Sequence, residues 1–403
     1  MTAVRVHLDT ETGPVVVGTA YITRLRGTTT TQFTYEDRYL AGHGWAISPD
    51  LPPMRRDART EGLPGALDDS APDAWGCNLI MRHLASEARA GGQVAPAPTE
   101  VDFLLGVNDH TRQGALRFSL GDDPTFLADG GEVPRLLDLE RLLEATRRVT
   151  QDDGDAGDAV TALLDAGSGS LGGARPKASV VDGDRLFIAK FPHLDDQWDV
   201  MAWEGVALDL AAACGLRTPP HRLLRIGGAT VLMVERFDRQ GLERIPFLSA
   251  RSLIGQRDDT AGDYLELVEA LTEHGSMVNA DLVELWRRIA FSIAINNTDD
   301  HLRNHAFLWK RNGWALSPIF DVNPNPATTA SRSTSIAGAT APTDSRAALF
   351  SSARRFNIDP FDAERYWAEI LGVIAGWRDT ATALEIPEPA QRQLEPALDR
   401  WRP

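Results

Sequence analysis

The stretch that decides how this chain is interpreted runs from Asn296 to Phe307 and reads N-N-T-D-D-H-L-R-N-H-A-F. Four residues separate Asp299 from Asn304, and an apolar, strand-like run further along the chain ends in Asp321. At this spacing a carboxylate can accept the proton of an attacking hydroxyl, while an amide and a second carboxylate hold magnesium. The D-x-x-x-x-N spacing alone is a weak motif, so its meaning depends on what precedes it.

A glycine-rich segment lies upstream, at residues 167–172, and reads G-S-G-S-L-G before Gly173. The β-rich runs that follow, 174–181 and 186–191, are joined by Asp-Gly, which predicts a hairpin and not the helix of a dinucleotide-binding fold. A P-loop is excluded because no Lys-Ser or Lys-Thr follows the last glycine. A flap over nucleotide phosphates remains, with a flexible surface loop as the alternative.

The next polar residues follow in the order of a protein-kinase nucleotide site. Lys190 ends an apolar strand, and Glu204 lies in an amphipathic helix. Kinases pair a strand lysine with a helix glutamate to position the α- and β-phosphates, although a lysine at a strand end is also commonly an exposed charge. The strand predicted over 229–234 leads to Glu235 and Phe237, whose main chain would lie beside adenine as a hinge.

Within the quoted stretch, Asp299 is the predicted general base because of its spacing to Asn304. Asp300 competes for this role, and Asp299 could instead cap the end of the preceding helix. His301 is a candidate phosphate contact, with a packed histidine bonded to the main chain as the alternative. Asn304 and Asp321 fit a magnesium site, because Mg²⁺ takes a few oxygen ligands and retains waters.

Two other chemistries are excluded. A Ser-His-Asp hydrolase needs a G-x-S-x-G elbow after a strand, whereas Ser170 lies in G-S-L-G without one. A zinc site built on His301 and His305 lacks the glutamate of H-E-x-x-H and a nearby cysteine.

Several longer segments carry a family resemblance. They are S-L-G-G-A-R-P-K from Ser170, V-E-R-F-D-R from Val234, T-D-D-H-L-R-N from Thr298, I-F-D-V from Ile319, A-L-D-D-S-A-P-D-A-W-G from Ala66 and L-L-G-V-N-D-H-T-R-Q-G-A-L-R-F from Leu104. Together they resemble the HipA family of bacterial toxin kinases over nearly the whole chain. The resemblance implies an α+β, protein-kinase-like two-lobed fold with a β-rich amino-terminal subdomain and a helical carboxy-terminal lobe. It divides the chain into an amino-terminal subdomain (1–120), a small lobe with the phosphate loop (121–238) and a large lobe with the catalytic and metal-binding loops (239–403).

The resemblance also implies an ATP- and magnesium-dependent serine/threonine protein kinase, whose substrate in the best-known members is an aminoacyl-tRNA synthetase. The residues it assigns to nucleotide binding are Ser170, Gly172, Gly173, Ala174, Lys177, Lys190, Glu204, Glu235, Phe237, His301 and Asn304. Ser170 matches a loop serine that these kinases autophosphorylate, and a phosphate there would repel ATP; the alternative is a small residue that suits a tight turn. The implied partner is a helix-turn-helix antitoxin of the HipB type, through which the chain would reach DNA only indirectly.

The sequence departs from better-known members in segments that flank the substrate cleft, which leaves the protein target open. Arg175-Pro176 stands where many members have Gln-Glu, residues 249–255 lack a frequent Glu-Asp-Phe, and Arg303 replaces a frequent lysine. Two alternatives are a small-molecule kinase of the same fold group and a catalytically inactive subunit of a repressor complex. The full-length resemblance argues against the first, and the intact set of polar residues argues against the second.

Composition sets the remaining limits. The 403 residues are 43% hydrophobic and 24% charged, which predicts two or three globular domains. The net charge of −16 argues against direct wrapping of nucleic acid. The start has no basic-then-apolar signal, and no run approaches the ~20 apolar residues of a membrane span. Cys77 and Cys214 are predicted to be buried free thiols, which predicts a cytoplasmic protein.

Periodicity predicts the main elements. Strands are expected before residue 55, including one over 28–39, and again at 115–120. A helix is expected over 72–89 with Ser70 as its cap. Further helices are expected over 136–150, 159–165, 264–274, 280–295, 360–380 and 389–401. Residues 327–344 have no clear period and predict a loop beside the metal site.

Overall fold

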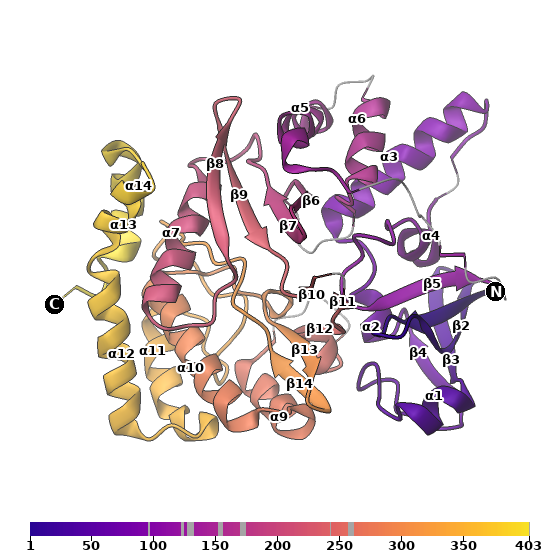
Figure 1. Cartoon of the computed structure of the whole chain (residues 1–403). Coiled ribbons are helices and arrows are strands. Elements are labelled where there is room, and N and C mark those ends of the chain that lie inside the picture. Colours follow the sequence, from indigo (N-terminus) through magenta and orange to yellow (C-terminus); the bar gives the residue numbers. More distant parts are fainter. Residues whose placement is uncertain are drawn as a thin grey trace. The chain divides into compact units, whose positions relative to one another are not determined.

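The computed structural model describes residues 1–95, 97–121, 125–126, 133–151, 156–169, 175–241, 243–256 and 262–402. The chain divides into two compact units (Figure 1). Unit 1 contains residues 1–195, 225–229 and 233–248, and unit 2 contains residues 196–224, 230–232 and 249–403. The three-domain division at residues 120 and 238 remains a prediction.

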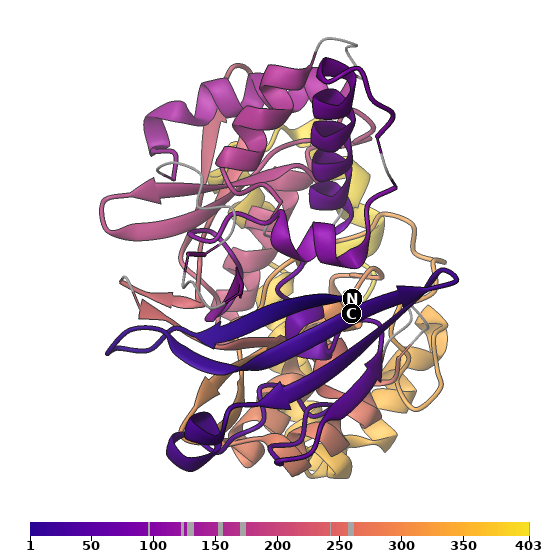
Figure 2. The same ribbon diagram turned by 90° about the vertical axis from the view of Figure 1, so that its right-hand side faces the viewer.

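A five-stranded antiparallel sheet with the order β4-β3-β2-β1-β5 forms the amino-terminal part of unit 1 (Figure 2). Its strands are β1 (Thr2–Leu8), β2 (Val15–Leu25), β3 (Thr28–Tyr35), β4 (Ala58–Glu61) and β5 (Leu116–Leu120). Val4, Val6 and Phe33 are fully buried, so one face of the sheet forms a core. The strand expected over 28–39 is too long, because helix α1 (Asp37–Gly42) begins two residues after Tyr35.

Helices form the rest of the amino-terminal half of unit 1. They are α2 (Gly65–Asp68), α3 (Ala74–Ala90), α4 (Glu100–Leu105), the 3₁₀ turn η1 (Leu136–Asp138), α5 (Leu139–Thr150) and α6 (Gly157–Asp165). Helix α6 packs against both α3 and α5 (Figure 1). The predicted helix over 72–89 is confirmed, but its predicted cap is wrong. The Ser70 hydroxyl donates back to the carbonyl of Ala66, and the Asp73 carboxylate instead accepts from the N–H of Gly76 at 2.8 Å.

The Asp-Gly hairpin is confirmed as β6 (Lys177–Asp182) and β7 (Arg185–Lys190), whose register pairs Asp182 with Arg185. Gly183 supplies the positive φ, +65°, that the tight turn requires. With β8 (His221–Ile226) and β9 (Ala229–Glu235), these strands form a sheet of order β6-β7-β9-β8. A short hairpin, β10 (Arg239–Gln240) and β11 (Glu243–Arg244), follows in unit 1.

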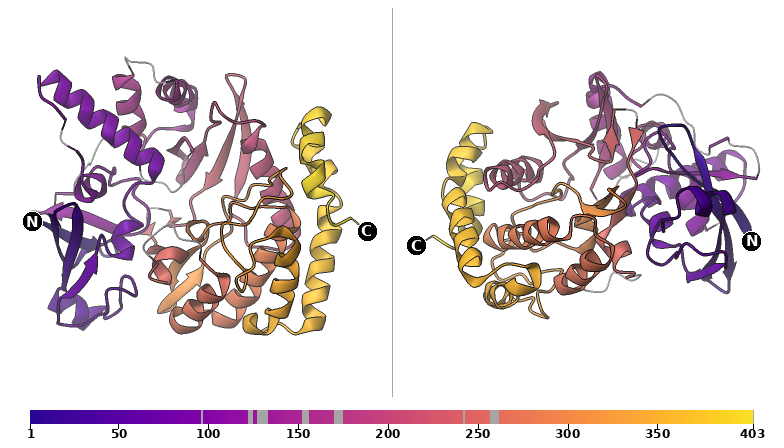
Figure 3. Two further views of the ribbon diagram at one scale, coloured as in Figure 1. Left: turned by 180° about the vertical axis from the view of Figure 1, so that it is seen from behind. Right: turned by 60° about the horizontal axis from the view of Figure 1, so that its bottom comes forward.

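Unit 2 is mainly helical. Its helices are α7 (Val200–Ala213), α8 (Ala250–Leu253), α9 (Tyr264–His274), α10 (Val278–Ala294), α11 (Pro342–Ser351), α12 (Pro360–Ile374), α13 (Trp377–Ala383) and α14 (Glu388–Leu398), with 3₁₀ turns η2 (Leu302–Asn304) and η3 (Ala353–Phe356). Figure 3 shows α12 to α14, in yellow, along α7, and α13 contacts α7. The single helix expected over 360–380 is divided at Gly376, which leaves α12 and α13 as separate helices.

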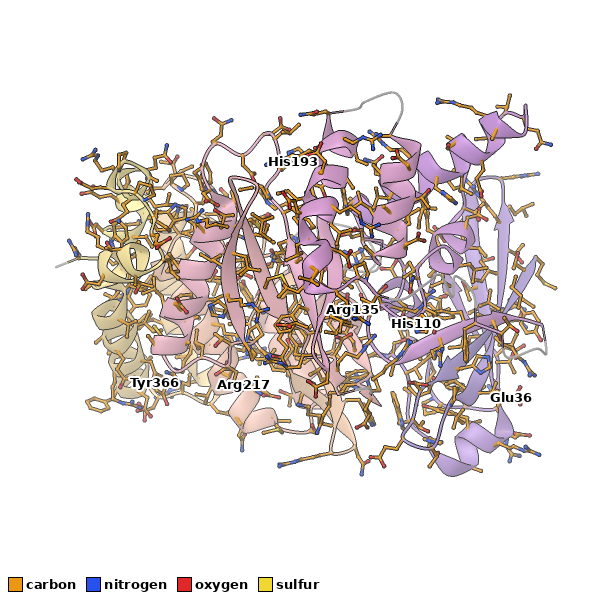
Figure 4. All side chains as sticks on the ribbon, turned by 45° about the horizontal axis from the view of Figure 1, so that its top comes forward. Glu36, His110, Arg135, His193, Arg217 and Tyr366 are labelled. Carbon is orange, nitrogen blue, oxygen red and sulfur yellow. The ribbon has the colours of Figure 1, made fainter. Side chains whose placement is uncertain are left out.

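An ion pair and two strands of a small sheet also belong to unit 2. Arg217, labelled in Figure 4, pairs with Asp281 of α10 at 2.7 Å and so fastens the segment after α7 to that helix. A three-stranded sheet has the order β12-β13-β14, from Phe247–Ser249, Ala306–Lys310 and Gly313–Leu316. None of the helices in the described ranges combines the length and apolar character of a membrane span.

The segment before Asp321 differs from its prediction. The strand β14 ends at Leu316, and residues 317–321 have no regular secondary structure. Pro318 explains this, because proline has no N–H for a strand ladder. Asp321 has a φ of +57°. The loop expected at 327–344 is confirmed up to α11, which begins at Pro342.

Candidate active site

The stretch 296–304 of unit 2 begins where α10 ends. Asn296 adopts a φ of +57°, a left-handed conformation that asparagine tolerates, and the chain leaves the helix there. The side-chain amide of Asn304 donates to the main-chain carbonyl of Asp299 at 2.9 Å, and its main-chain N–H donates to the carbonyl of His301 at 2.8 Å. These bonds close the loop on itself. Because the amide NH₂ is held by a carbonyl, the side-chain oxygen of Asn304 is the atom suited to ligate a cation.

The Asp299 carboxylate is exposed and has a weak local partner. The Ser333 hydroxyl lies 3.4 Å from its Oδ1. Partial desolvation raises the pKa of Asp299, His301 opposes that rise, and the negative charge of Asp321 adds to it. The influence of Asp321 on this pKa means that the two carboxylates repel each other, and a cation between them would remove that repulsion.

The neighbouring Asp300 is in the opposite situation. Its Oδ2 accepts from Tyr264 at 2.5 Å and from Ser292 at 2.9 Å, and lies 3.4 Å from Arg332. Its Oδ1 lies 3.0 Å from Nε2 of His305. The side chain is buried, yet His305 and Arg332 hold its pKa well below the usual range for an aspartate against the cost of burial. Asp300 is therefore an internal anchor that joins the stretch to α9, α10 and the loop before α11.

The donor set of Asn304 and Asp321 fits magnesium better than a transition metal. No group of three or more His, Cys, Asp or Glu side chains suited to a metal occurs within the described ranges. One carboxylate and one amide oxygen leave room for the waters and phosphate oxygens that Mg²⁺ retains. Asp321 is half-buried, and its left-handed backbone is one that aspartate adopts more readily than most residues.

Comparison with known proteins decides the family. Residues 14–118 match the model of the HipA N-terminal domain, and residues 169–377 match that of the HipA-like C-terminal domain. The chain belongs to the HipA family. It is also 24% identical over 282 residues to the toxin YjjJ of Escherichia coli (strain K12), which covers 66% of this chain and 60% of YjjJ. The HipA-family chain thus spans less than two thirds of that relative's length.

Two solved structures are similar to this HipA-family chain. One is HipA of Shewanella oneidensis MR-1, from a complex of HipA, HipB and operator DNA; it matches at a TM-score of 0.70 and 14% identity over 99% of this chain and 97% of that one. The predicted α+β HipA-like fold is thereby confirmed. The Helicobacter pylori proinflammatory kinase CtkA matches 55% of this chain and 91% of its own at 12% identity, with a TM-score of 0.39 that is too low to support a shared fold.

The predicted nucleotide residues fall in separate parts of the HipA-family chain. Lys190 is buried at the end of β7 in unit 1, and Glu204 is buried within α7 in unit 2, so their pairing stays a prediction. Glu235 ends β9 and lies 3.1 Å from Arg185, while the ring of Phe237 stacks on Phe247 at 6.5 Å.

The remaining predicted residues fall in or next to the glycine-rich segment, apart from His301, which belongs to unit 2. Lys177 begins β6, and its ammonium lies 2.9 Å from Oδ2 of Asp73 instead of facing open solvent. Nδ1 of His301 is buried and has no hydrogen-bond partner among the described residues, and the role of this histidine stays a prediction. Ser170, Gly172, Gly173 and Ala174 lie outside the described residues.

Sequence reasoning missed a buried cluster around Asp238, formed by Asp238, Arg236 and Arg239 in unit 1. Asp238 accepts from Arg236 at 2.7 and 2.9 Å, from Arg239 at 2.9 Å and from the N–H of Gly114 at 2.8 Å. Arg236 also donates to the carbonyl of Thr111 at 2.5 Å. The loop held in this way includes His110, which Figure 4 labels. The signal in the sequence is R-F-D-R, which predicts a hinge and carries part of the family resemblance but does not indicate a buried ion cluster.

Proposed function

We propose that this HipA-family chain is an ATP- and magnesium-dependent serine/threonine protein kinase. The observation that carries the proposal is the contrast between two adjacent aspartates. Asp300 is occupied by four side chains, whereas the neighbouring Asp299 is exposed, and its pKa responds to the nearby Asp321. A base for phosphoryl transfer must be accessible to a hydroxyl substrate, and of the two only Asp299 has that accessibility.

In this proposal each polar residue has one task. Asp299 orients the serine hydroxyl and accepts its proton. The side-chain oxygens of Asn304 and Asp321 hold magnesium, which neutralises charge on the transferred phosphate when bound. His301 contributes its buried, unpaired Nδ1 to the same loop, where it would contact phosphate.

Nucleotide binding is assigned to the residues that follow the kinase order in the sequence. Lys190, paired with Glu204, would position the α- and β-phosphates, and the main chain of Glu235 and Phe237 would bind adenine. The glycine-rich segment would cover the phosphates through Ser170, Gly172, Gly173 and Ala174. Since no member of the catalytic and metal set is missing from the sequence, an inactive subunit is the weaker alternative.

The substrate class and the partner follow from the family. The substrate would be a serine on a cellular protein, as for the aminoacyl-tRNA synthetases that the best-known members act on, and Ser170 would be an autophosphorylation site. The Shewanella oneidensis HipA structure contains HipB and operator DNA, which supports a HipB-type antitoxin here. The net charge of −16 fits a protein that reaches DNA through such a partner in the cytoplasm.

The test is incubation of the purified chain with Mg²⁺ and γ-labelled ATP, alone and with protein and small-molecule acceptors, followed by mapping of phosphosites by mass spectrometry. We expect label on Ser170 or on a protein serine in the wild type and none in Asp299→Asn. Label on small molecules alone would favour the small-molecule kinase. Neither label nor nucleotide binding in the wild type would overturn the proposal.

A further inference from the structure

The D-A-W-G sequence at residues 73–76 is a motif that the proposed chemistry does not use. Asp73 stands directly before α3 and uses its two oxygens for different partners. Oδ1 accepts from the N–H of Gly76, which caps the helix, and Oδ2 lies 2.9 Å from the ammonium of Lys177. The side chains of Asp73 and Lys177 are only 10% and 4% exposed, so this ion pair is inside unit 1.

Lys177 is the residue at which the glycine-rich segment passes into β6. Burial raises the pKa of the Asp73 carboxyl, and the Lys177 ammonium and the Gly76 N–H oppose that rise. The charged form of each of these two groups is therefore stabilised by the other. Removing the Asp73 carboxylate would take this ion pair from the buried Lys177 ammonium, which carries a large penalty in a protein interior.

The other end of the glycine-rich segment lies on the same helix terminus. A Cβ added to Gly76 would lie 2.7 Å from both the Cα and the carbonyl oxygen of Gly169, so the main chains touch there. Gly167 has a φ of +65°, and a Cβ on it would lie 2.1 Å from the hydroxyl of Thr111. Only glycine fits at 76 and 167, because the neighbouring atoms already fill the space of a side chain.

A main-chain bond joins the two ends. The N–H of Ser179 in β6 donates to the carbonyl of Ala166 at 2.9 Å, just before Gly167. The chain therefore enters the glycine-rich segment at 167–169 and leaves it at Lys177 with both ends fixed to one another and to α3. Fixing the two ends of a segment reduces the conformational entropy that is lost when a ligand binds to it.

We propose that Asp73 and Gly76 at the start of α3 are positioning residues that anchor both ends of the glycine-rich segment for binding nucleotide phosphates. At the β6 end, the anchor is the ion pair between Asp73 and Lys177. The inference rests on the proposed kinase function and deepens it. In this inference the D-A-W-G motif increases the affinity for nucleotide. Lys177 acts through Asp73 and is not itself a phosphate ligand.

The first test is Asp73→Asn, which keeps the helix cap, since asparagine caps about as well as aspartate, but removes the charge opposite Lys177. We expect the Kd for Mg-ATP to rise about tenfold, which corresponds to about 1.4 kcal/mol, with KM for ATP rising in parallel and kcat changing less. Asp359→Asn, the same substitution at the cap of α12, is the matched control and should change neither constant.

A double variant tests whether Lys177 acts through its ion pair with Asp73 or binds phosphate directly. In Asp73→Asn/Lys177→Met no charge is left unpaired, so nucleotide affinity should recover partly relative to Asp73→Asn alone. If Lys177 contacted phosphate, Lys177→Met would bind ATP worse than Asp73→Asn, and the double variant would not recover. That pattern would overturn the role assigned to Lys177.

The second test needs no nucleotide. Gly76→Ala should speed amide hydrogen exchange in 166–169 and 177–182, because the new methyl group must displace Gly169. Gly91→Ala at the other end of α3, where a Cβ meets only ordinary contacts of 3.6 Å or more, should leave that exchange unchanged. Thermal unfolding of each variant would show that the fold is kept.

The outcomes distinguish this inference from the function on which it rests. Wild-type protein that binds Mg-ATP, together with Asp73→Asn and Gly76→Ala variants that bind it equally well, would overturn the anchor and leave the kinase proposal standing. Wild-type protein that binds no nucleotide would overturn both. Weaker binding in both variants with faster exchange in 166–169 would support the anchor.

Discussion

Asn304 donates a hydrogen bond from its side-chain amide to the main-chain carbonyl of Asp299, with 2.9 Å between the two heavy atoms. In the proposed mechanism this bond ties a metal ligand to the residue that accepts the substrate proton. The four-residue interval between Asp299 and Asn304 is thus the length of a loop closed by its own hydrogen bond, which gives a physical reason for the spacing.

The first prediction concerns Asp299. Asp299→Asn should lower the rate of phosphoryl transfer about 10²–10⁴-fold, the usual contribution of a general base, because an amide cannot accept the hydroxyl proton. The Kd for Mg-ATP, measured by calorimetry, should stay within about threefold, since the base adds little to ground-state binding. Transfer at the wild-type rate in this variant would show that another group is the base.

The second prediction concerns Asp321. Asp321→Asn should weaken Mg-nucleotide binding, because a neutral amide replaces a charged ligand. Asparagine is the appropriate substitution, since it tolerates the φ of +57° at this position and does not strain the backbone. Titration of ATP at several Mg²⁺ concentrations should show an affinity loss that shrinks as Mg²⁺ rises. The same affinity as the wild type at low Mg²⁺ would remove Asp321 from the metal site.

The third prediction concerns the stability provided by Asp300. Asp300→Asn should lower the free energy of unfolding by about 3–5 kcal/mol, the cost of breaking a buried ion pair, because Arg332 would lose its counter-charge and His305 its carboxylate partner. Glu269→Gln is the control, since Glu269 pairs with Arg355 at the surface, and such pairs contribute at most about 1 kcal/mol. Urea unfolding at pH 7 measures both.

The same variant predicts a dependence on pH. The folded-state pKa of Asp300 is lowered, so its stabilisation is present above the unfolded value of about 3.9 and is lost as pH falls through the folded value. The difference in unfolding free energy between the wild type and Asp300→Asn should therefore be largest near neutral pH and shrink below about pH 4. A difference that is equal at pH 7 and pH 3 would contradict the ionised state of Asp300.

Local signals were enough to predict several elements. The hairpin at 177–190 and the helix Tyr264–His274 were predicted because each is defined by residues next to one another, an Asp-Gly turn and an amphipathic period. Ser70 was the wrong cap because a cap depends on the backbone geometry at the first turn, and Ser70 lies three residues before the true cap, Asp73. The strand predicted to reach Asp321 ended early at Leu316 for a similar reason, since Pro318 outweighs the apolar pattern.

The candidate site shows the limit of local signals more clearly. Asp299 and Asp300 are adjacent and chemically identical in the sequence, and what separates them is the set of distant side chains around Asp300. Tyr264, Ser292 and Arg332 come from three different elements. Their convergence depends on tertiary packing, for which a single sequence holds no direct signal. The anchor between Asp73 and Lys177, 104 positions apart, was missed for the same reason.

The last prediction concerns Asp238. Its carboxylate accepts hydrogen bonds from Arg236, Arg239 and the N–H of Gly114, and two guanidinium groups hold its pKa well below the usual range despite complete burial. Asp238→Asn should leave two buried arginines with insufficient negative charge and lower the unfolding free energy of unit 1 by about 3–5 kcal/mol.

Asp37→Asn is the matched control for Asp238→Asn, because Asp37 forms an exposed ion pair with Arg55, and its loss should cost less than about 1 kcal/mol. The two variants remove the same charge from unit 1, so net charge cannot explain a difference between them. Hydrogen exchange would localise the loss, since the loop that contains Thr111 and Gly114 is held by Arg236 and Asp238. Equal stability of the two variants would show that the Asp238 cluster contributes no more than an exposed pair.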